Sequence, residues 1–260
     1  MASQQRKAGV PTMAAVAAGH QSMSGGTLYL SYGMASVKGR RPALTDAVVA
    51  MPSFSPLSPE MPLDYFAVVD GRFGEAVAGH LREQLGFAIA NQIAGELLCE
   101  APRFLAGSAD VVGWWRTTIR AAFQDVEEEA VGGGAVVGDD AATAGATALV
   151  ALVHESYVVV GNNGGSSAVV SRAGGEVVQL MSEQRANRTD ETQGAEHSGA
   201  AAGSSPSNPG VVTEPEVAAV ERTPRDEFLL LASDGLWEAV TPPAACAFVR
   251  RRLLTRITMP

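Results

Sequence analysis

The chain is poor in cysteine and in long apolar runs, and each shortage argues against a class of protein. Its two cysteines, Cys99 and Cys246, have no CxxC spacing, which argues against a disulfide framework and a cysteine-rich metal site. No apolar stretch reaches the length of about 18 residues that a membrane-spanning helix needs. We therefore expect an intracellular protein of the cytoplasm or nucleus, with both thiols reduced and no membrane association.

Positive charge is also scarce. The chain has 19 Lys and Arg residues against 28 Asp and Glu, which gives a formal net charge of -9. Binding to nucleic acid usually needs a basic face, so we expect no nucleic-acid partner. With 46% hydrophobic residues in 260, the chain has enough apolar material for one large domain, which we expect to be a monomer.

Two segments lack a hydrophobic pattern. Residues 1–27 are rich in Ala, Gly and Ser and contain Arg6 and Lys7 but no acid, which predicts a disordered leader, with an organelle transit peptide as the alternative. Residues 182–222 lose their periodicity and include a low-complexity run, which predicts a mobile loop. The rest of 28–260 reads as one folded domain.

Within that domain, short apolar runs alternate with longer amphipathic segments. Apolar runs joined by Gly- and Asn-rich turns predict antiparallel strands, and apolar residues at helical spacing predict helices. Strands are expected at 28–34, 46–51, 65–69, 147–153, 157–160, 168–171 and from 226 onward, and helices at 73–99, 110–130 and 244–254. Antiparallel strands with helices available to cover them favour a layered α+β fold.

Two of the predicted strands end in the same dipeptide, Asp-Gly. Residues 65–69 lead into Asp70-Gly71, and residues 228–232 lead through Ser233 into Asp234-Gly235. The glycine permits a sharp exit, so each carboxylate is held at a strand end near the surface. Carboxylates are usual ligands of Mg²⁺ and Mn²⁺, and a carbonyl beside glycine can approach a metal closely. Either dipeptide taken alone is more typical of a plain turn than of a metal site.

Several stretches together resemble a known family. The chain is similar to the type 2C, metal-dependent Ser/Thr protein phosphatases, especially those of plants, and the run Phe-Leu-Leu-Leu-Ala-Ser-Asp-Gly-Leu-Trp is the most specific match. The matching stretches are 32–46, 66–71, 145–148, 157–180 and 226–238. The resemblance implies an α/β/β/α sandwich of two antiparallel sheets flanked by helices. It also implies that the fold is incomplete at the C-terminus, because the chain stops before the family's Asp-Asn strand.

The resemblance also implies a chemistry. Members of this family hydrolyse phosphoserine and phosphothreonine in proteins with two Mg²⁺ or Mn²⁺ ions that activate a water. By this resemblance Asp70 bridges both metals, the Gly71 carbonyl binds one, and Asp234 holds the other. Arg41 is implied to bind the substrate phosphate, and Asp46 to be a further acid beside the metal centre.

Three departures from the family pattern remove chemical groups. Thr45 stands where the family has a metal-binding Glu, and Arg72 stands where it has a His thought to act as general acid. Gly165 stands where it has an Asp associated with an additional metal. An arginine cannot donate a proton near neutral pH, and a centre with fewer carboxylates binds Mg²⁺ more weakly.

These departures leave two functions open. The first is a weak or inactive Ser/Thr phosphatase that depends on Mg²⁺ or Mn²⁺ and takes phosphoprotein substrates. The second is a phosphatase-like scaffold that binds a partner protein without catalysis.

Overall fold

The protein forms two five-stranded antiparallel sheets. The computed structural model describes residues 13–22, 28–38, 43–54, 63–71, 75–99, 111–132, 147–181 and 215–257. Sheet A has the order β2 (Leu28–Val37), β1 (Met13–Ser22), β10 (Asp226–Ala232), β7 (Ser167–Arg172), β8 (Val177–Gln179). Sheet B has the order β3 (Ala47–Met51), β4 (Asp64–Asp70), β5 (Thr147–Val153), β6 (Tyr157–Asn162), β9 (Glu216–Glu221).

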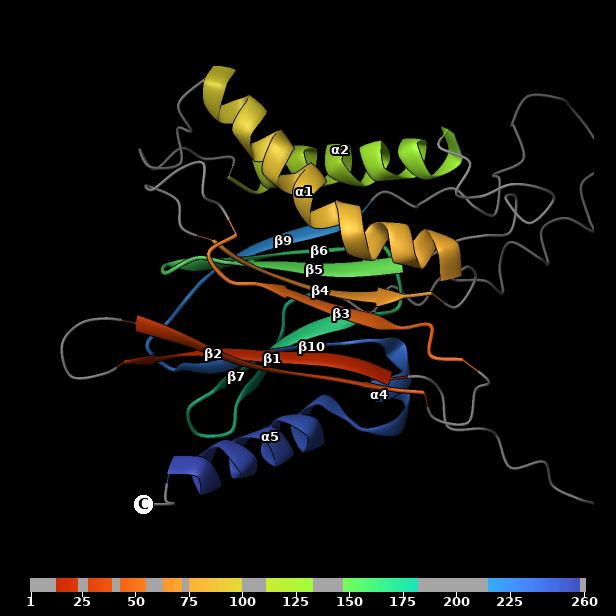
Figure 1. The fold of residues 1–260 in the computed structure, drawn as a ribbon. Coiled ribbons are helices and arrows are strands. Elements are labelled where there is room, and N and C mark those ends of the chain that lie inside the picture. The colour runs from red at the N-terminus through yellow and green to blue at the C-terminus, as the bar shows by residue number, and fades with distance from the viewer. Residues whose placement is uncertain are drawn as a thin grey trace, which may run out of the picture.

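The sheets stack between two layers of helices. Helices α1 (Glu75–Cys99) and α2 (Val111–Gly132) cover the outer face of sheet B, and α5 (Pro242–Ile257) covers that of sheet A (Figure 1). The short helix α4 (Asp234–Ala239) follows β10 directly. The predicted α/β/β/α sandwich is therefore confirmed. No described helix is both long and apolar enough to cross a membrane.

Strand alternation produces this layering, because successive side chains point to opposite faces of a sheet. In β4, Phe66 and Val68 belong to the core between the sheets, whereas Tyr65, Ala67 and Val69 belong to the core beneath α1 and α2. Both faces of β4 are thus buried. A strand in this position reads as a continuous apolar run, which is the pattern that residues 65–69 show.

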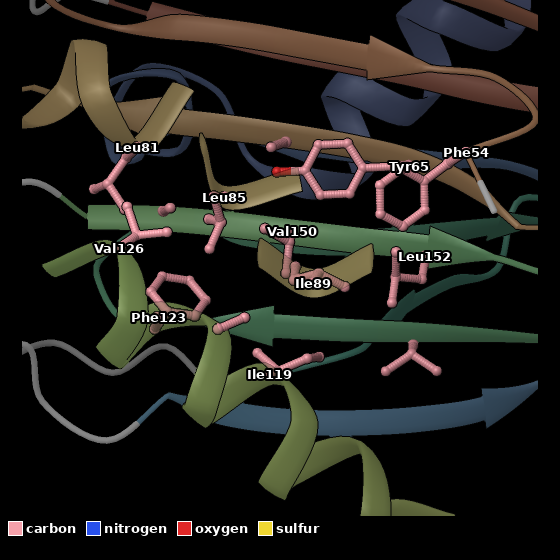
Figure 2. Close-up of a cluster of buried hydrophobic side chains, with 14 of the residues drawn as sticks. Phe54, Tyr65, Leu81, Leu85, Ile89, Ile119, Phe123, Val126, Val150 and Leu152 are labelled. Atoms are coloured by element: carbon pink, nitrogen blue, oxygen red, sulfur yellow. The ribbon is translucent and has the colours of Figure 1, made fainter. Parts of the chain in front are cut away.

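The helices of the outer layer contribute side chains at helical spacing. Leu81, Leu85 and Ile89 of α1 lie four residues apart, and Ile119 and Phe123 of α2 have the same spacing. Figure 2 shows these side chains meeting above the surface of sheet B. A third, smaller core of Val169, Phe228, Leu230, Ala245 and Cys246 lies between sheet A and α5.

The structure corrects two predictions of irregular chain. Residues 13–22, within the predicted leader, form β1, which pairs with both β2 and β10. Glu216–Glu221, within the predicted loop 182–222, forms β9 and pairs with β6. In β9, Val217 and Ala219 are two residues apart and so point to the same face of the strand. Both belong to the core beneath α1 and α2. The composition of both segments concealed these strands, and β10 and β6, with which they pair, are distant from them in sequence.

Candidate active site

Two carboxylate residues lie side by side at one end of sheet B. Asp70 is the last residue of β4 and shares the inner face of the sheet with Phe66 and Val68. The register of β3 and β4 pairs Ala47 with Val69, and one further step sets Asp46 opposite Asp70. Both aspartates are buried, with 4% and 6% exposure respectively. Neighbouring strands lie about 4.8 Å apart, so this register brings the two carboxylates into one site.

The same row continues across β5 to the next turn. Asp70 pairs with Thr147, the first residue of β5. A β-carbon built on Gly164 would overlap the side chain of Thr147, so the turn after β6 lies directly against this threonine. Sequence reasoning did not select Thr147 as a site residue. The sequence feature that could have indicated it is a threonine at the start of β5, whose other residues are all apolar.

The third predicted carboxylate reaches this end of the sandwich from sheet A. Asp234 is the first residue of α4, immediately after β10. A β-carbon at Gly165 would lie 3.5 Å from Oδ2 of Asp234. Gly164 and Gly165 belong to the turn that leads from β6 in sheet B to β7 in sheet A. This turn therefore contacts Thr147 through Gly164 and Asp234 through Gly165, and so connects the residues of sheet B to Asp234.

The indole of Trp237 fixes α4 in this place. Its Nε1–H donates to the carbonyl oxygen of Ala232 at 3.0 Å and to that of Ser167 at 3.2 Å. These carbonyls belong to the paired ends of β10 and β7. The position of Asp234 is thus set by the strand ends through one shared hydrogen-bond donor.

Gly71 is required for close packing. A β-carbon there would lie 2.6 Å from the carbonyl oxygen of Thr45 and 2.8 Å from Cβ of Ala78. The described glycines with positive φ are Gly174 and Gly175, in the turn after β7, so Gly71 needs no unusual backbone angle. The glycine after Asp70 serves to let the segment before β3 and helix α1 approach the strand end.

Two hydroxyl groups hold the segment that carries Asp46. The side chain of Ser36 in β2 donates to the carbonyl oxygen of Asp46 at 3.0 Å. The side chain of Thr45 donates to Oδ1 of Asp46 at 3.4 Å. Thr45 therefore contacts the neighbouring carboxylate. Ser36 was not recognised from the sequence, because its partner lies in the segment that precedes β3 of the other sheet.

The structure thus brings four of the five predicted site residues, Asp46, Asp70, Gly71 and Asp234, to one end of the sandwich. The fifth, Arg41, lies outside the described residues, as does Arg72. Their roles stay predictions.

The oxygen atoms at this end suit a hard divalent cation in kind, because Mg²⁺ and Mn²⁺ prefer carboxylate, carbonyl and hydroxyl ligands. Two buried oxygen atoms of the adjoining turn, Oδ1 of Asn162 and Oγ of Ser166, have no hydrogen-bond partner among the described residues. The described part of the chain, however, holds no group of three or more His, Cys, Asp or Glu side chains placed to hold a metal. The residues therefore fit such a cation in ligand type, with few charges to retain it.

Comparisons with known proteins agree with this architecture. The family model "Protein phosphatase 2C" matches residues 30–203 and 197–258. The chain is 31% identical to "Protein phosphatase 2C 56" of Arabidopsis thaliana, covering 86% of this chain and 55% of the relative. It is 33% identical to "Probable protein phosphatase 2C 8" of Oryza sativa subsp. japonica, covering 87% of this chain and 64% of the relative. The chain thus spans between about half and two thirds of the length of these relatives.

Solved structures show the same fold at low sequence identity. The serine-threonine phosphatase 2C of Toxoplasma gondii aligns with a TM-score of 0.58 and 14% identity, over 79% of this chain and 78% of that one. A C. elegans sex determining protein aligns with a TM-score of 0.56 and 19% identity, over 80% of this chain and 52% of that one. Together with the match over most of the sequence, these likenesses show that the chain belongs to the protein phosphatase 2C family.

Proposed function

We propose that this chain hydrolyses phosphoserine and phosphothreonine in proteins with low efficiency and depends on Mg²⁺ or Mn²⁺. The proposal rests on the arrangement of residues at the end of sheet B. There Asp46 lies opposite Asp70 on the inner face of the sheet, and Gly71 follows Asp70 in the chain. Asp234 comes to the same end from the other sheet. We further expect a monomer that acts inside the cell.

Each residue of the row has a role in this proposal. Asp70 and Asp234 would hold the cation from opposite sheets, and the carbonyl of Gly71 would complete the contact from the strand end. A bound divalent cation supplies Lewis-acid polarisation of the phosphate and a water of lowered pKa. Arg41, which carries a planar guanidinium, would bind and orient the phosphate oxygens.

Two features argue for low efficiency. Arg72 occupies the place of a proton donor in the family pattern, and the loss of a general acid typically costs about 10²–10⁴-fold in rate. Thr45 offers Asp46 a hydroxyl where the family pattern has a carboxylate. A cation held by few carboxylates is bound weakly, so high concentrations of Mn²⁺ or Mg²⁺ should be needed.

The second candidate is a phosphatase-like scaffold that binds a phosphoprotein without turning it over. It is favoured by the absence, among the described residues, of any group of three or more side chains placed to hold a metal. In this case the end of the sandwich that holds Asp70 and Asp234 would bind the phosphoprotein without hydrolysing it.

The deciding experiment is hydrolysis of a phosphothreonine peptide during a Mn²⁺ titration, with Asp70→Asn and Asp64→Asn compared. Asp64 begins the strand that Asp70 ends, and its Oδ1 accepts a hydrogen bond from the Ser53 N–H at 2.8 Å, far from the site. We expect Asp70→Asn to lower kcat/KM by at least about a hundredfold and Asp64→Asn to leave it unchanged. Absence of turnover in the folded wild-type protein would reject the enzyme in favour of the scaffold.

A further inference from the structure

The solvent-facing side of α5 has an unusual composition. The helix packs on the outer face of sheet A, and its exposed side carries, at helical spacing, Ala244, Ala247, Phe248 and Arg251, with Arg252 beside Phe248. We call these five residues the α5 stripe. The ring of Phe248 is 58% exposed, although a surface helix normally turns charged and polar residues toward water. The stripe is therefore apolar in its N-terminal half and cationic at its C-terminal end.

A second exposed aromatic residue shows the ordinary pattern. Phe87 of α1 is also exposed, but Glu83 and Asn91, four residues before and after it, are both polar and exposed. Single exposed apolar side chains of this kind are common and need no partner. The α5 stripe differs because its apolar residues are consecutive along one helix face and lead into arginines.

Arg250, the first arginine of the run in α5, anchors the helix to sheet A. Its Nε–H donates to Oε2 of Glu227 at 2.6 Å. Its Nη2 donates to Oγ of Ser171 at 2.6 Å and to the carbonyl oxygen of Arg172 at 2.9 Å. These partners belong to β10 and β7. The stripe is thus presented on a fixed helix, which lowers the entropy cost of binding a partner.

The next exposed arginine combines with the aromatic ring. The guanidinium carbon of Arg252 lies 5.3 Å from the centre of the Phe248 ring. A cation over an aromatic face is attracted by the ring, and a guanidinium in this position keeps N–H donors that can bind a carboxylate in two-pronged fashion. The pair therefore offers an apolar surface and a carboxylate-binding group side by side.

Charge complementarity selects the kind of partner. Helix α5 contains four arginines and no Asp or Glu, in a chain of formal net charge -9. An acidic segment is therefore attracted to this helix and repelled by the rest of the chain, which confines it to the stripe. Recognition of an anionic membrane usually needs a cluster of about 4–8 Lys or Arg, and the acidic remainder of the chain would oppose it. Two stripes facing each other in a dimer would place like charges together.

We propose that the α5 stripe is the docking surface for an acidic segment of a partner protein. An apolar side chain of that segment packs on Phe248, and a carboxylate beside it pairs with Arg252. The inference goes beyond the proposed function and is independent of it, because the stripe contains none of the residues at the end of sheet B. Hydrolysis of a phosphopeptide can be present or absent whatever binds here.

The test begins with selection of a phage-displayed library of random peptides on the folded wild-type chain. We expect the enriched peptides to combine Asp or Glu with an apolar residue, and to bind more weakly as NaCl is raised from about 50 to 500 mM. The Kd of one enriched peptide is then measured by fluorescence anisotropy. Phe248→Ala and Arg252→Gln should each raise this Kd by about tenfold.

Matched controls come from α1, in the helix layer on the opposite side of the sandwich. Phe87→Ala removes a similarly exposed ring, and Arg82→Gln removes a half-exposed arginine. Both should leave the Kd unchanged. The Tm of Phe248→Ala and of Arg252→Gln should equal that of the wild type, because both side chains are exposed. If one variant has a lowered Tm, the other decides the test.

Several results would overturn the inference. These are no enrichment, enriched peptides without an excess of acidic residues, or equal binding by the wild type and Phe248→Ala. Co-sedimentation with vesicles of phosphatidylcholine and phosphatidylserine that is lost in Arg252→Gln would assign the stripe to a membrane instead. A dimer in analytical ultracentrifugation that is lost in Phe248→Ala would assign it to a second copy of the chain.

Discussion

Residue 165 has no side chain, and the place where its β-carbon would stand is 3.5 Å from a carboxylate oxygen of Asp234. The two residues come from different segments, the β6–β7 turn and the start of α4, and meet where the sheets adjoin. A side chain added at Gly165 would therefore contact Asp234 directly. A charged side chain at this position would change the net charge of the site.

Gly165→Asp should raise the affinity for Mn²⁺ and lower stability without it. A second carboxylate beside Asp234 repels it by on the order of 1 kcal/mol when no cation is bound, and shares a cation when one is present. The Tm measured with and without Mn²⁺ should therefore differ more than in the wild type. Gly165→Asn provides the uncharged control, and an equal Mn²⁺ effect in both variants would contradict this account.

Gly71→Ala should destabilise the protein by about 1–3 kcal/mol, because the new methyl group meets the Thr45 carbonyl and Cβ of Ala78 at distances that require backbone movement. Gly33→Ala is the matched control, since Gly33 in β2 is exposed and has nothing within 4 Å of the added carbon. Urea denaturation of both variants measures the difference. Similar midpoints would show that the strand end can relax without cost.

Phe123→Ala should lower the free energy of unfolding by about 3–5 kcal/mol, because its ring is 1% exposed in the core between sheet B and the helices. Phe87→Ala on α1 should change it by less than about 0.5 kcal/mol, because that ring is 61% exposed. Denaturant unfolding followed by circular dichroism compares the two. A large loss from Phe87→Ala would mean that its ring packs against something in solution.

His154 should make the protein less stable in mild acid. Burial is the main cause that lowers the pKa of His154, with Arg222 acting in the same direction and Glu155 opposing it. Its Nδ1 accepts a hydrogen bond from the Ser156 N–H at 3.1 Å, and its ring stacks on Tyr157. The unfolded chain then binds a proton near pH 6.5 that the folded protein resists, so stability falls as the pH drops below about 6.5.

The measurement for His154 is the urea midpoint at about pH 7.5 and about pH 5.5, for the wild type and His154→Gln. The variant should lose part of the decrease between the two pH values. An identical decrease in both proteins would assign the acid sensitivity to other groups.

The sequence predicted those parts of the site that depend on neighbouring residues. Asp70 and Asp234 were identifiable because each closes an apolar strand, and the predicted strand and helix bounds differ from the observed ones by a few residues. The opposition of Asp46 to Asp70 depends on the register between two strands, which no local pattern specifies. Ser36 and Thr147 were missed because their partners, Asp46 and Asp70, are brought to them by the tertiary fold rather than by neighbouring residues. Strands β1 and β9 were missed because their compositions resemble those of irregular chain.

The site takes its residues from both sheets, and this has a thermodynamic consequence. Asp70 belongs to sheet B, and Asp234 follows strand β10 of sheet A. Elsewhere the two sheets meet through apolar side chains. A ligand that contacts both residues is a cross-link between the two halves of the sandwich. Its binding energy then opposes separation of the sheets, so amide hydrogens in β4 and β10 should exchange more slowly, and together, when the ligand is bound. Occupancy of the site would thus be measurable from the protection of backbone amides in β4 and β10 at positions distant from the ligand.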